Sequence, residues 1–449
     1  MKKSNIRFFA VAVVLLAATS CQKEEIRTLK ATFERFENES KAYIDDDYYS
    51  CWEANDAVAI NGTSCAVTLA SGSAQARSAQ IVVPAELNGQ NLLAFYPADK
   101  ISDMSAVGGT VDFPHIQIYM ENTEGKQIID NPMAAYCPSD GTELKFHNLG
   151  SLLKVTIPNN EDIKAIQVKG VDNQMLCGKA QIKFDNNGNP MLTSCTNGSN
   201  SVTLRFPSPV TANGKSFYIV LPPNTNFETL TIAVLANNGT SWAHHAKTAD
   251  MGRVLARNHI AAFSYDISHH TDYDFVADWT MRYTASCQVE IETSYMEDHI
   301  AYHNFSGTKG LVVFEDIITK VSDYTYFGED YLQSITIPAS VTEIGASAFQ
   351  DCNGLTSVSA PCATIIGNSA FFACHELSSV SVPCLTAIGF AAFAACTNLS
   401  HIYSRTGLPT IGTNVFDNVP SSAVLHLPSS LSGATWPGWP GTYDYDYNN

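Results

Sequence analysis

The sequence has few basic residues and no long apolar run. In 449 residues it holds 26 Lys and Arg against 44 Asp and Glu, so its formal net charge is −18. A charge of that sign repels phosphate backbones and anionic lipid, which argues against nucleic acid as a partner. The apolar run at residues 8–18 is too short to cross a bilayer as a helix. Hydrophobic residues still make up 45% of the chain and charged ones 16%, so we expect a folded protein of two or three domains.

Motifs that support catalysis are missing as well. The chain has no Gly-x-Ser-x-Gly elbow, no zinc-peptidase helix motif and no phosphate-binding glycine loop. The pairs His244–His245 and His269–His270 would point to opposite faces of a strand, so neither pair prepares a metal site. The sequence therefore predicts no catalytic residue, no metal and no cofactor, and we expect the protein not to be an enzyme.

Helical periodicity is absent from the first half of the chain. Between residues 28 and 267, short alternating segments recur instead, as at residues 151–157, 215–221 and 229–235. Asn-Gly pairs, which supply the positive φ angles of tight hairpins, occur at residues 61–62, 88–89, 187–188, 197–198, 213–214 and 238–239. Many short strands with regular turns predict antiparallel β-sandwiches.

Residues 1–20 are predicted to be a signal peptide. Lys2, Lys3 and Arg7 precede the apolar run, and small residues lead into Cys21. This arrangement resembles a bacterial lipoprotein signal; the alternative is an ordinary secretory signal followed by a chance cysteine. The resemblance implies a lipid on Cys21 and a short tether at residues 21–30. The next four residues resemble the signal that sends Bacteroidota-type lipoproteins to the outer face of the cell: Gln22, Lys23, Glu24 and Glu25.

A repeat of 22 or 23 residues occupies the C-terminal region. Leucines, Ile-Gly pairs, phenylalanines and cysteines each recur at this spacing. A fixed period of this length predicts a solenoid, because one coil cannot bury its own apolar face while stacked coils share a core. The predicted core residues are Leu332, Leu355, Leu377, Leu399, Phe349, Phe371, Phe393, Cys352, Cys374 and Cys396.

Both halves resemble known families. Ordered motifs such as Trp52–Ile60, Leu144–Lys154 and Phe217–Pro223 resemble fimbrillin-like domains, which implies two consecutive sandwich subdomains and a role in fimbriae or surface adhesion. The Ile-Pro, Ile-Gly, Ala-Phe and Cys positions of the repeat resemble BspA-like leucine-rich repeats. The expected fold is therefore mainly β: two sandwiches followed by a short leucine-rich-repeat solenoid. The predicted boundaries are a first sandwich at 31–160, a second at 161–268, a hairpin-rich connector at 269–310, and repeats with a cap at 311–449.

Cysteines and terminal aromatics leave some alternatives open. In a parallel ladder the Cβ vectors do not converge, so the repeat cysteines are interpreted as reduced core residues rather than a redox or metal site. Cys177 and Cys195 lie nearly symmetrically about a turn and form a candidate disulfide. Trp436 and Trp439 are interpreted as sealing the solenoid. Candidate ligand contacts are the tyrosines that follow them: Tyr443, Tyr445 and Tyr447.

Together these features predict a lipid-anchored, surface-exposed outer-membrane protein that acts in adhesion. It would be a fimbrial tip or accessory subunit, or a free-standing adhesin. The expected partners are a host or bacterial surface macromolecule, other fimbrial subunits, or both. Two alternatives remain: a structural fimbrial subunit that polymerises by strand exchange, and a surface lipoprotein that captures glycans.

Overall fold

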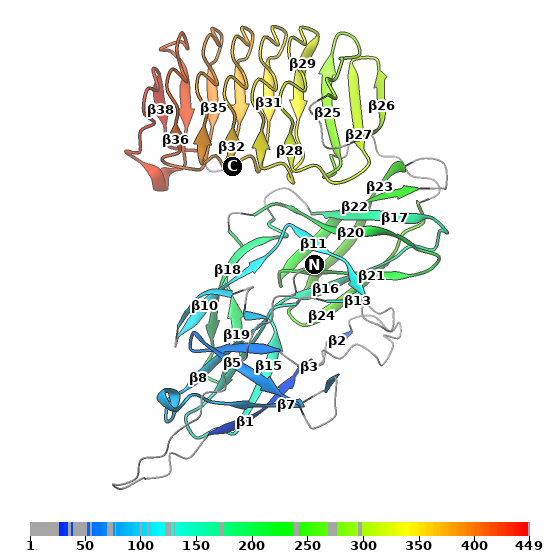
Figure 1. The fold of residues 1–449 in the computed structure, drawn as a ribbon, viewed down its shortest axis with the longest axis vertical. Coiled ribbons are helices and arrows are strands. Elements are labelled where there is room, and N and C mark those ends of the chain that lie inside the picture. Colours follow the sequence, from blue (N-terminus) through cyan, green and yellow to red (C-terminus); the bar gives the residue numbers. More distant parts are fainter. Residues whose placement is uncertain are drawn as a thin grey trace, which may run out of the picture.

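The structure is a computed structural model, and three β-rich units follow one another along its long axis (Figure 1). It describes residues 27–447 apart from gaps at 35–36, 39–51, 54–55, 70–74, 77, 99–100, 106, 122–126, 130, 171–173, 197, 238–241, 268–275 and 295–298. Within these residues the chain forms strands and two short 3-10 helices, η1 (Ala85–Leu87) and η4 (Ser429–Leu431), but no α-helix. Among the described segments, no helix is long and apolar enough to span a membrane.

The first unit is a seven-stranded ring that lies at the end of the molecule farthest from the repeats (Figure 1). The ring closes because β1 pairs on one side with β7, antiparallel, and on the other with β15, parallel. Alternation of apolar and polar residues, clear in β5, turns one side of each strand inward onto a core around Trp52 and Phe146. In order around the ring the strands are β1 (Thr28–Phe33), β15 (Glu143–Asn148), β14 (Met133–Cys137), β8 (Leu92–Tyr96), β4 (Ala57–Ile60), β5 (Thr63–Thr68) and β7 (Ser78–Val82).

A four-stranded sheet connects the first unit with the second. Its strands are β19 (Pro190–Leu192), β18 (Gly178–Phe184), β10 (Gly108–Phe113) and β9 (Ile101–Ser105). The hairpin of β18 and β19 thus crosses the position near residue 160 where we predicted the two sandwiches to meet. Its core joins Phe95 of β8 to Leu152 and Tyr218 of the second unit. Two short two-stranded ribbons complete this half: β3 (Trp52–Glu53) with β6 (Gln75–Ala76), and β12 (Met120–Glu121) with β13 (Gln127–Ile128).

The second unit is a sandwich of two sheets. One sheet holds β11 (Ile116–Ile118), β20 (Ser201–Thr211), β17 (Asp162–Lys169), β22 (Thr225–Asn237) and β23 (Trp242–Leu255). The other holds β2 (Glu37–Asn38), β24 (His259–Ser264), β16 (Ser151–Thr156) and β21 (Ser216–Leu221). Val155, Phe206 and Phe217 are fully buried in the core between the sheets.

The third unit is a solenoid built on two parallel ladders. One ladder continues an antiparallel leader of three strands in the order β26 (Ile300–Ser306), β27 (Lys309–Phe314) and β25 (Thr280–Ala285). From β25 it runs through β29 (Leu332–Thr336), β31 (Ser357–Ser359), β33 (Ser379–Ser381), β35 (His401–Tyr403), β37 (Val424–His426) and β38 (Thr442–Asp444). The other ladder holds β28 (Lys320–Val321), β30 (Glu343–Ile344), β32 (Ile365–Ile366), β34 (Ala387–Ile388) and β36 (Thr410–Ile411).

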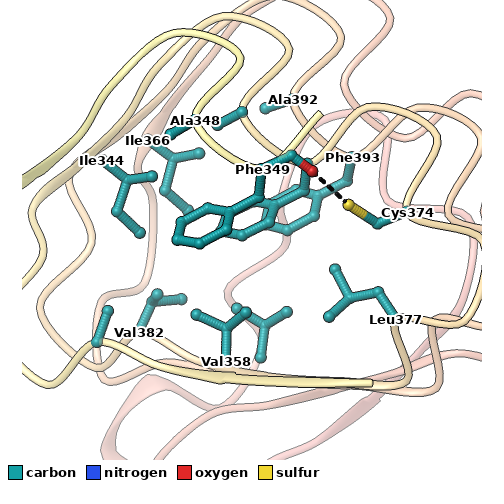
Figure 2. Close-up of a cluster of buried hydrophobic side chains, with 14 of the residues drawn as sticks. Ile344, Ala348, Phe349, Val358, Ile366, Cys374, Leu377, Val382, Ala392 and Phe393 are labelled. Atoms are coloured by element: carbon teal, nitrogen blue, oxygen red, sulfur yellow. Dashed lines mark hydrogen bonds between the residues drawn. The ribbon is translucent and has the colours of Figure 1, made fainter. Parts of the chain in front are cut away.

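Stacked aromatic rings run along the solenoid axis between the two ladders. Neighbouring rings of Tyr326, Phe349, Phe371 and Phe393 lie 5.2–5.3 Å apart and within 8° of parallel. Figure 2 shows two of these rings, Phe349 and Phe393, with aliphatic side chains packed above and below them. Each aromatic pair contributes about 0.5–1.5 kcal/mol beyond the area it buries.

Candidate functional site

The repeat positions predicted from the sequence form one continuous core. All ten predicted core residues are fully buried, with relative exposure of 0% in each case. They belong to a single cluster that extends from the leader to the terminal tryptophans. Trp436 and Trp439 are also buried, and the ring of Trp439 meets that of Phe416 edge-on at 5.1 Å. The tryptophans therefore close the last coil.

The glycine of each Ile-Gly pair sets how closely the coils approach. A Cβ placed on Gly367 would lie 2.7 Å from the backbone of the preceding coil, and one on Gly389 would lie 2.6 Å from it. Real Cβ atoms do not come that close, so a side chain would push the coils apart. The first coil carries Ser322 in this column, next to β28, which is the first strand of that ladder in the part of the chain that the structure describes.

The repeat cysteines serve the same core. Each thiol donates a hydrogen bond to a backbone carbonyl of the coil before it: Cys352 to Tyr326 at 2.9 Å, Cys374 to Phe349 at 2.9 Å, and Cys396 to Phe371 at 3.0 Å. The bond from Cys374 is the dashed line in Figure 2. All three thiols are free in the structure. Burial raises the pKa of the Cys396 thiol to about 12, which keeps it protonated and unreactive.

The candidate disulfide between Cys177 and Cys195 is not formed. Both residues are free thiols. Across the β18–β19 hairpin, Ile182 pairs with Leu192 and Lys179 bridges to Thr196, so Cys195 lies opposite residue 180 rather than opposite Cys177. The two strands therefore pair in a register that is shifted from the symmetry about the turn on which the predicted disulfide was based.

Two rows of outward side chains line the solvent face of the longer ladder. Buried residues such as Val358 and Val380 alternate with them along each strand, as the pleat requires. The first row runs through the strands in register as Ser334, Ser357, Ser379, His401, Val424 and Thr442. The second runs as Thr336, Ser359, Ser381, Tyr403, His426 and Asp444. The face thus changes from small hydroxyls to aromatic and histidine side chains toward the C-terminal end.

The C-terminal end of this face is an ordered patch of rings. The rings of Tyr403 and His426 stack at 4.4 Å and 9° from parallel. His426 Nδ1 lies 2.8 Å from a carboxylate oxygen of Asp444, and its Nε2 lies 3.0 Å from His401 Nδ1. The hydrogen bond between His426 and Asp444 lowers the pKa of Asp444 below its ordinary value. Tyr447 lies 5.3 Å from Tyr403 and completes the patch.

Only one of the three tyrosines expected to contact a ligand reaches this patch. Tyr447 stands beside Tyr403, but Tyr443 and Tyr445 pack against the solenoid core. Their hydroxyls bond the backbone of the cap: Trp436 N donates to the Tyr443 hydroxyl at 2.9 Å, and the Tyr445 hydroxyl donates to a carbonyl at 2.9 Å. The reason is the alternation of β38, in which Thr442 and Asp444 face outward and Tyr443 faces inward.

A buried aspartate that sequence reasoning missed joins the solenoid to the sandwich. Asp278 is fully buried. Its carboxylate lies 2.8 Å from His115 Nε2, accepts a hydrogen bond from Thr203, and accepts one from Ser340 N at 3.2 Å. Burial alone would raise the pKa of Asp278, but His115 outweighs burial and lowers it. Burial would likewise lower the pKa of His115, and Asp278 holds that pKa well above the ordinary histidine value.

Other contacts reinforce the same junction. Trp279 packs with Leu235 and Ala246 of the sandwich, and its indole N–H donates to His244 at 3.1 Å. Asp316 accepts a bidentate pair of bonds from Arg205, at 3.2 and 3.0 Å. These contacts thus connect the repeats to the sandwich through an apolar cluster and several polar bonds.

Cys177 lies near the same junction, and its neighbours raise the question of a thiol enzyme. Its Sγ is 3.8 Å from His115 Nδ1, and His115 in turn contacts Asp278. Cys177 is only 2% exposed, however, and His115 Nδ1 lies closer to the carbonyl of Ser201, at 3.0 Å. The arrangement therefore acts as a structural network. Among the described residues, no group of three or more His, Cys, Asp or Glu side chains is placed to hold a metal ion.

The N-terminal predictions lie outside the described residues. These are the signal peptide, the lipidated Cys21 and the surface-export residues Gln22, Lys23, Glu24 and Glu25. They remain predictions from the sequence.

Comparison with known families bears on the solenoid. Residues 319–434 match the model of the BspA type leucine rich repeat region in six copies. These are BspA-type leucine-rich repeats. The six copies include coils at both ends that keep the sequence pattern only in part. No curated protein matches the chain.

Solved structures share only a distant likeness with this chain. A candidate cell adhesion protein from Bacteroides ovatus is 11% identical over 55% of this chain and 95% of its own, with a TM-score of 0.31. A fimbrial protein from the same species is 12% identical over 58% of this chain and 52% of its own, with a TM-score of 0.25. The pneumococcal vaccine antigen PcpA is 11% identical over 30% of this chain and 40% of its own, with a TM-score of 0.18. At these TM-scores the likenesses establish neither a shared fold nor a shared function.

Proposed function

We propose that this chain is a non-enzymatic cell-surface adhesion lipoprotein whose repeats bind a macromolecular partner. The observation that carries this proposal is the solvent face of the repeat ladder, where two rows of mostly polar side chains end in an aromatic patch. A rigid, repetitive face of this kind lowers the ordering cost of binding a large partner.

The arrangement of the units supports a stalk and a head. The strand β1 lies at the opposite end of the molecule from the repeats (Figure 1). A lipid on Cys21, seven residues before β1, would hold that end at the outer membrane and turn the repeats outward. The junction around Asp278 and Trp279 would keep the head at a fixed angle to the stalk. In this proposal the first two units form a fimbrillin-like stalk, and the protein is a fimbrial tip or accessory subunit or a free-standing adhesin.

Adherence of cells that display a shortened chain tests the proposal. A chain cut after Ile267 keeps both sheets of the sandwich and should reach the surface at the same level as the full chain. We expect it to lose adherence to host or bacterial surfaces. Circular dichroism of the purified protein should still show β-structure, which separates loss of the head from loss of folding. Equal adherence by a folded stalk would contradict binding through the repeats.

A further inference from the structure

We propose that the C-terminal end of the repeat face binds a neutral saccharide, with a sugar ring stacked on Tyr403 and its hydroxyls bonded by the serine rows. This inference rests on the proposed adhesion through the repeats and names the chemical class of the partner. It is carried by three features of the face: free hydroxyls, an aromatic ring in register with them, and a scarcity of charge.

The serine rows offer hydrogen-bonding groups that the fold leaves unused. Within the described residues, no side-chain hydrogen bond engages Ser357, Ser359, Ser379 or Ser381. By contrast, Thr284 and Ser334 at the leader end bond each other at 2.6 Å. A hydroxyl can donate one bond and accept others, so a regular row of them suits a ligand that is itself rich in hydroxyls.

The ring of Tyr403 borders the surface that these serine hydroxyls form. On one side it stacks on His426, which is held in turn by Asp444. On the other side its partner in register is Ser381, which carries no ring. A tyrosine fixed in this way offers an amphipathic surface: an apolar face for the C–H groups of a sugar and a hydroxyl at its edge.

The spacing of the serine rows suits a short run of sugar rings. Adjacent strands of a ladder lie about 4.8 Å apart, so β31 and β35 are separated by about 10 Å. Ser359 and Ser381 occupy that interval beside Tyr403 in one row. Ser357 and Ser379 occupy it in the other row. A saccharide lying across the strands would therefore meet two hydroxyls for each coil it crosses.

Charge argues for a neutral ligand. The whole chain has a formal net charge of −18, which disfavours an anionic polymer. The two rows of the repeat ladder contain a single acidic residue, Asp444, and its carboxylate is already paired with His426. Arg405 stands at the edge of the patch, over the ring of Tyr447 at 6.0 Å. A polycation would find no array of carboxylates on this face.

Binding of defined glycans by the purified full chain tests the inference. The probes are mannan, galactan, xylan, β-glucan and starch, with polygalacturonate as the anionic comparator, in affinity electrophoresis followed by calorimetry. We expect at least one neutral glycan to bind and polygalacturonate not to bind. Tyr403→Ala should weaken that binding by about tenfold or more, because it removes the stacking ring. Tyr403→Phe keeps the ring and should stay within about threefold of the wild type.

Two further variants keep the test independent of folding. Ser381→Arg places a bulky side chain on the serine surface beside Tyr403 and leaves the core unchanged. It should also abolish binding. Tyr331→Ala removes a tyrosine that is 57% exposed and lies outside both rows, so it should bind as the wild type does.

Each remaining outcome separates this inference from the proposed adhesion. If no neutral glycan binds, yet Tyr403→Ala cells lose adherence, the partner is a protein and the saccharide inference is overturned while adhesion stands. If a glycan binds equally well to Tyr403→Ala and Ser381→Arg, the site lies elsewhere and the inference is again overturned. If the wild-type chain binds a glycan through Tyr403 but cells adhere without the repeats, the saccharide site stands and the proposed adhesion falls.

Discussion

At the scale of single residues, two carboxylates, one buried and one partly buried, join segments that are far apart in the chain. Asp278 connects His115 of the sandwich region to Ser340 of the repeats. Glu34 contacts His147 Nδ1 at 3.1 Å and Arg257 at 2.8 Å. Neither contact has a local sequence signal, because the partners are brought together only by the tertiary fold. In the sequence, a lone aspartate or glutamate that is buried in the fold looks the same as one that faces solvent.

The first residue-scale prediction concerns Asp278. Asp278→Ala leaves the largely buried His115 without its counter-charge, and breaking a buried pair costs about 3–5 kcal/mol. Denaturant unfolding of the full chain measures the loss. The control is Asp316→Ala, whose side chain is 27% exposed and whose partner Arg205 is 41% exposed; it should cost about 1 kcal/mol or less. Similar losses in both variants would contradict the assignment of Asp278 as the central contact of the junction.

The second residue-scale prediction is a pH dependence through Glu34. Burial alone would raise the pKa of Glu34, but hydrogen bonds from His147 and Arg257 outweigh burial and lower it to about 2, from 4.5. Because the folded pKa is depressed, the stabilisation is present above about pH 4.5 and is lost as the pH falls toward 2. Glu34→Gln should therefore lower the urea midpoint clearly near neutral pH, and the gap to the wild type should narrow below pH 4.5.

Glu143→Gln is the matched control for Glu34. Its carboxylate is 50% exposed and pairs loosely with Lys30 at 3.8 Å, so the substitution should change the midpoint little at any pH. A gap for Glu34→Gln that stays constant down to pH 2 would show that its carboxylate is not the titrating group.

At the scale of elements, the sequence predicted the solenoid but not the directions of the side chains in its last strand. The repeat columns follow from the sequence because each coil contacts only its neighbours, so the period alone places Phe371 and Cys374 inside. Tyr443 points inward because of the register of β38. The repeat pattern does not continue into β38, so the sequence offers no equivalent position from which to predict this direction. The Cys177–Cys195 prediction failed for a similar reason, since the hairpin register is shifted from symmetry about the turn.

The element-scale prediction tests the shared core. Phe371 is fully buried between two stacked rings, so Phe371→Ala opens a cavity and should cost about 3–5 kcal/mol in unfolding free energy. Phe390→Ala, on a neighbouring coil, removes a ring that is 48% exposed and should cost about 1 kcal/mol or less. Equal costs in thermal or denaturant unfolding would show that the ring stack is not the core of the solenoid.

At the scale of the whole molecule, the sequence predicted the order of the units better than their boundaries. The change from alternating strands to a fixed repeat separates the two halves of the chain clearly. The β18–β19 hairpin, however, returns from residues 178–192 to pair with β10 in the first part of the chain. Such a return is a long-range pairing, and short alternating segments do not specify which distant strand each one will join.

The prediction at the scale of the whole molecule is lipid anchoring, which depends on Cys21. Cys21→Ala removes the acceptor of the lipid and should move the protein from the membrane fraction to the soluble fraction. Protease added to intact cells tests surface exposure and should digest the wild-type chain. Retention of the Cys21→Ala protein with membranes, or protection of the wild-type chain from protease, would contradict the anchored and outward-facing arrangement.

The central claim is that the solvent face of the repeat ladder makes the adhesive contact. The most direct measurement is adherence of cells that display the full chain with Ser359→Arg and Ser381→Arg, which place bulky side chains on this face. The matched control is Thr397→Arg, an exposed hydroxyl residue outside the two rows. At equal surface expression, we predict that the double variant loses adherence and that the Thr397→Arg variant adheres as the wild type does. Undiminished adherence by the double variant would contradict the claim.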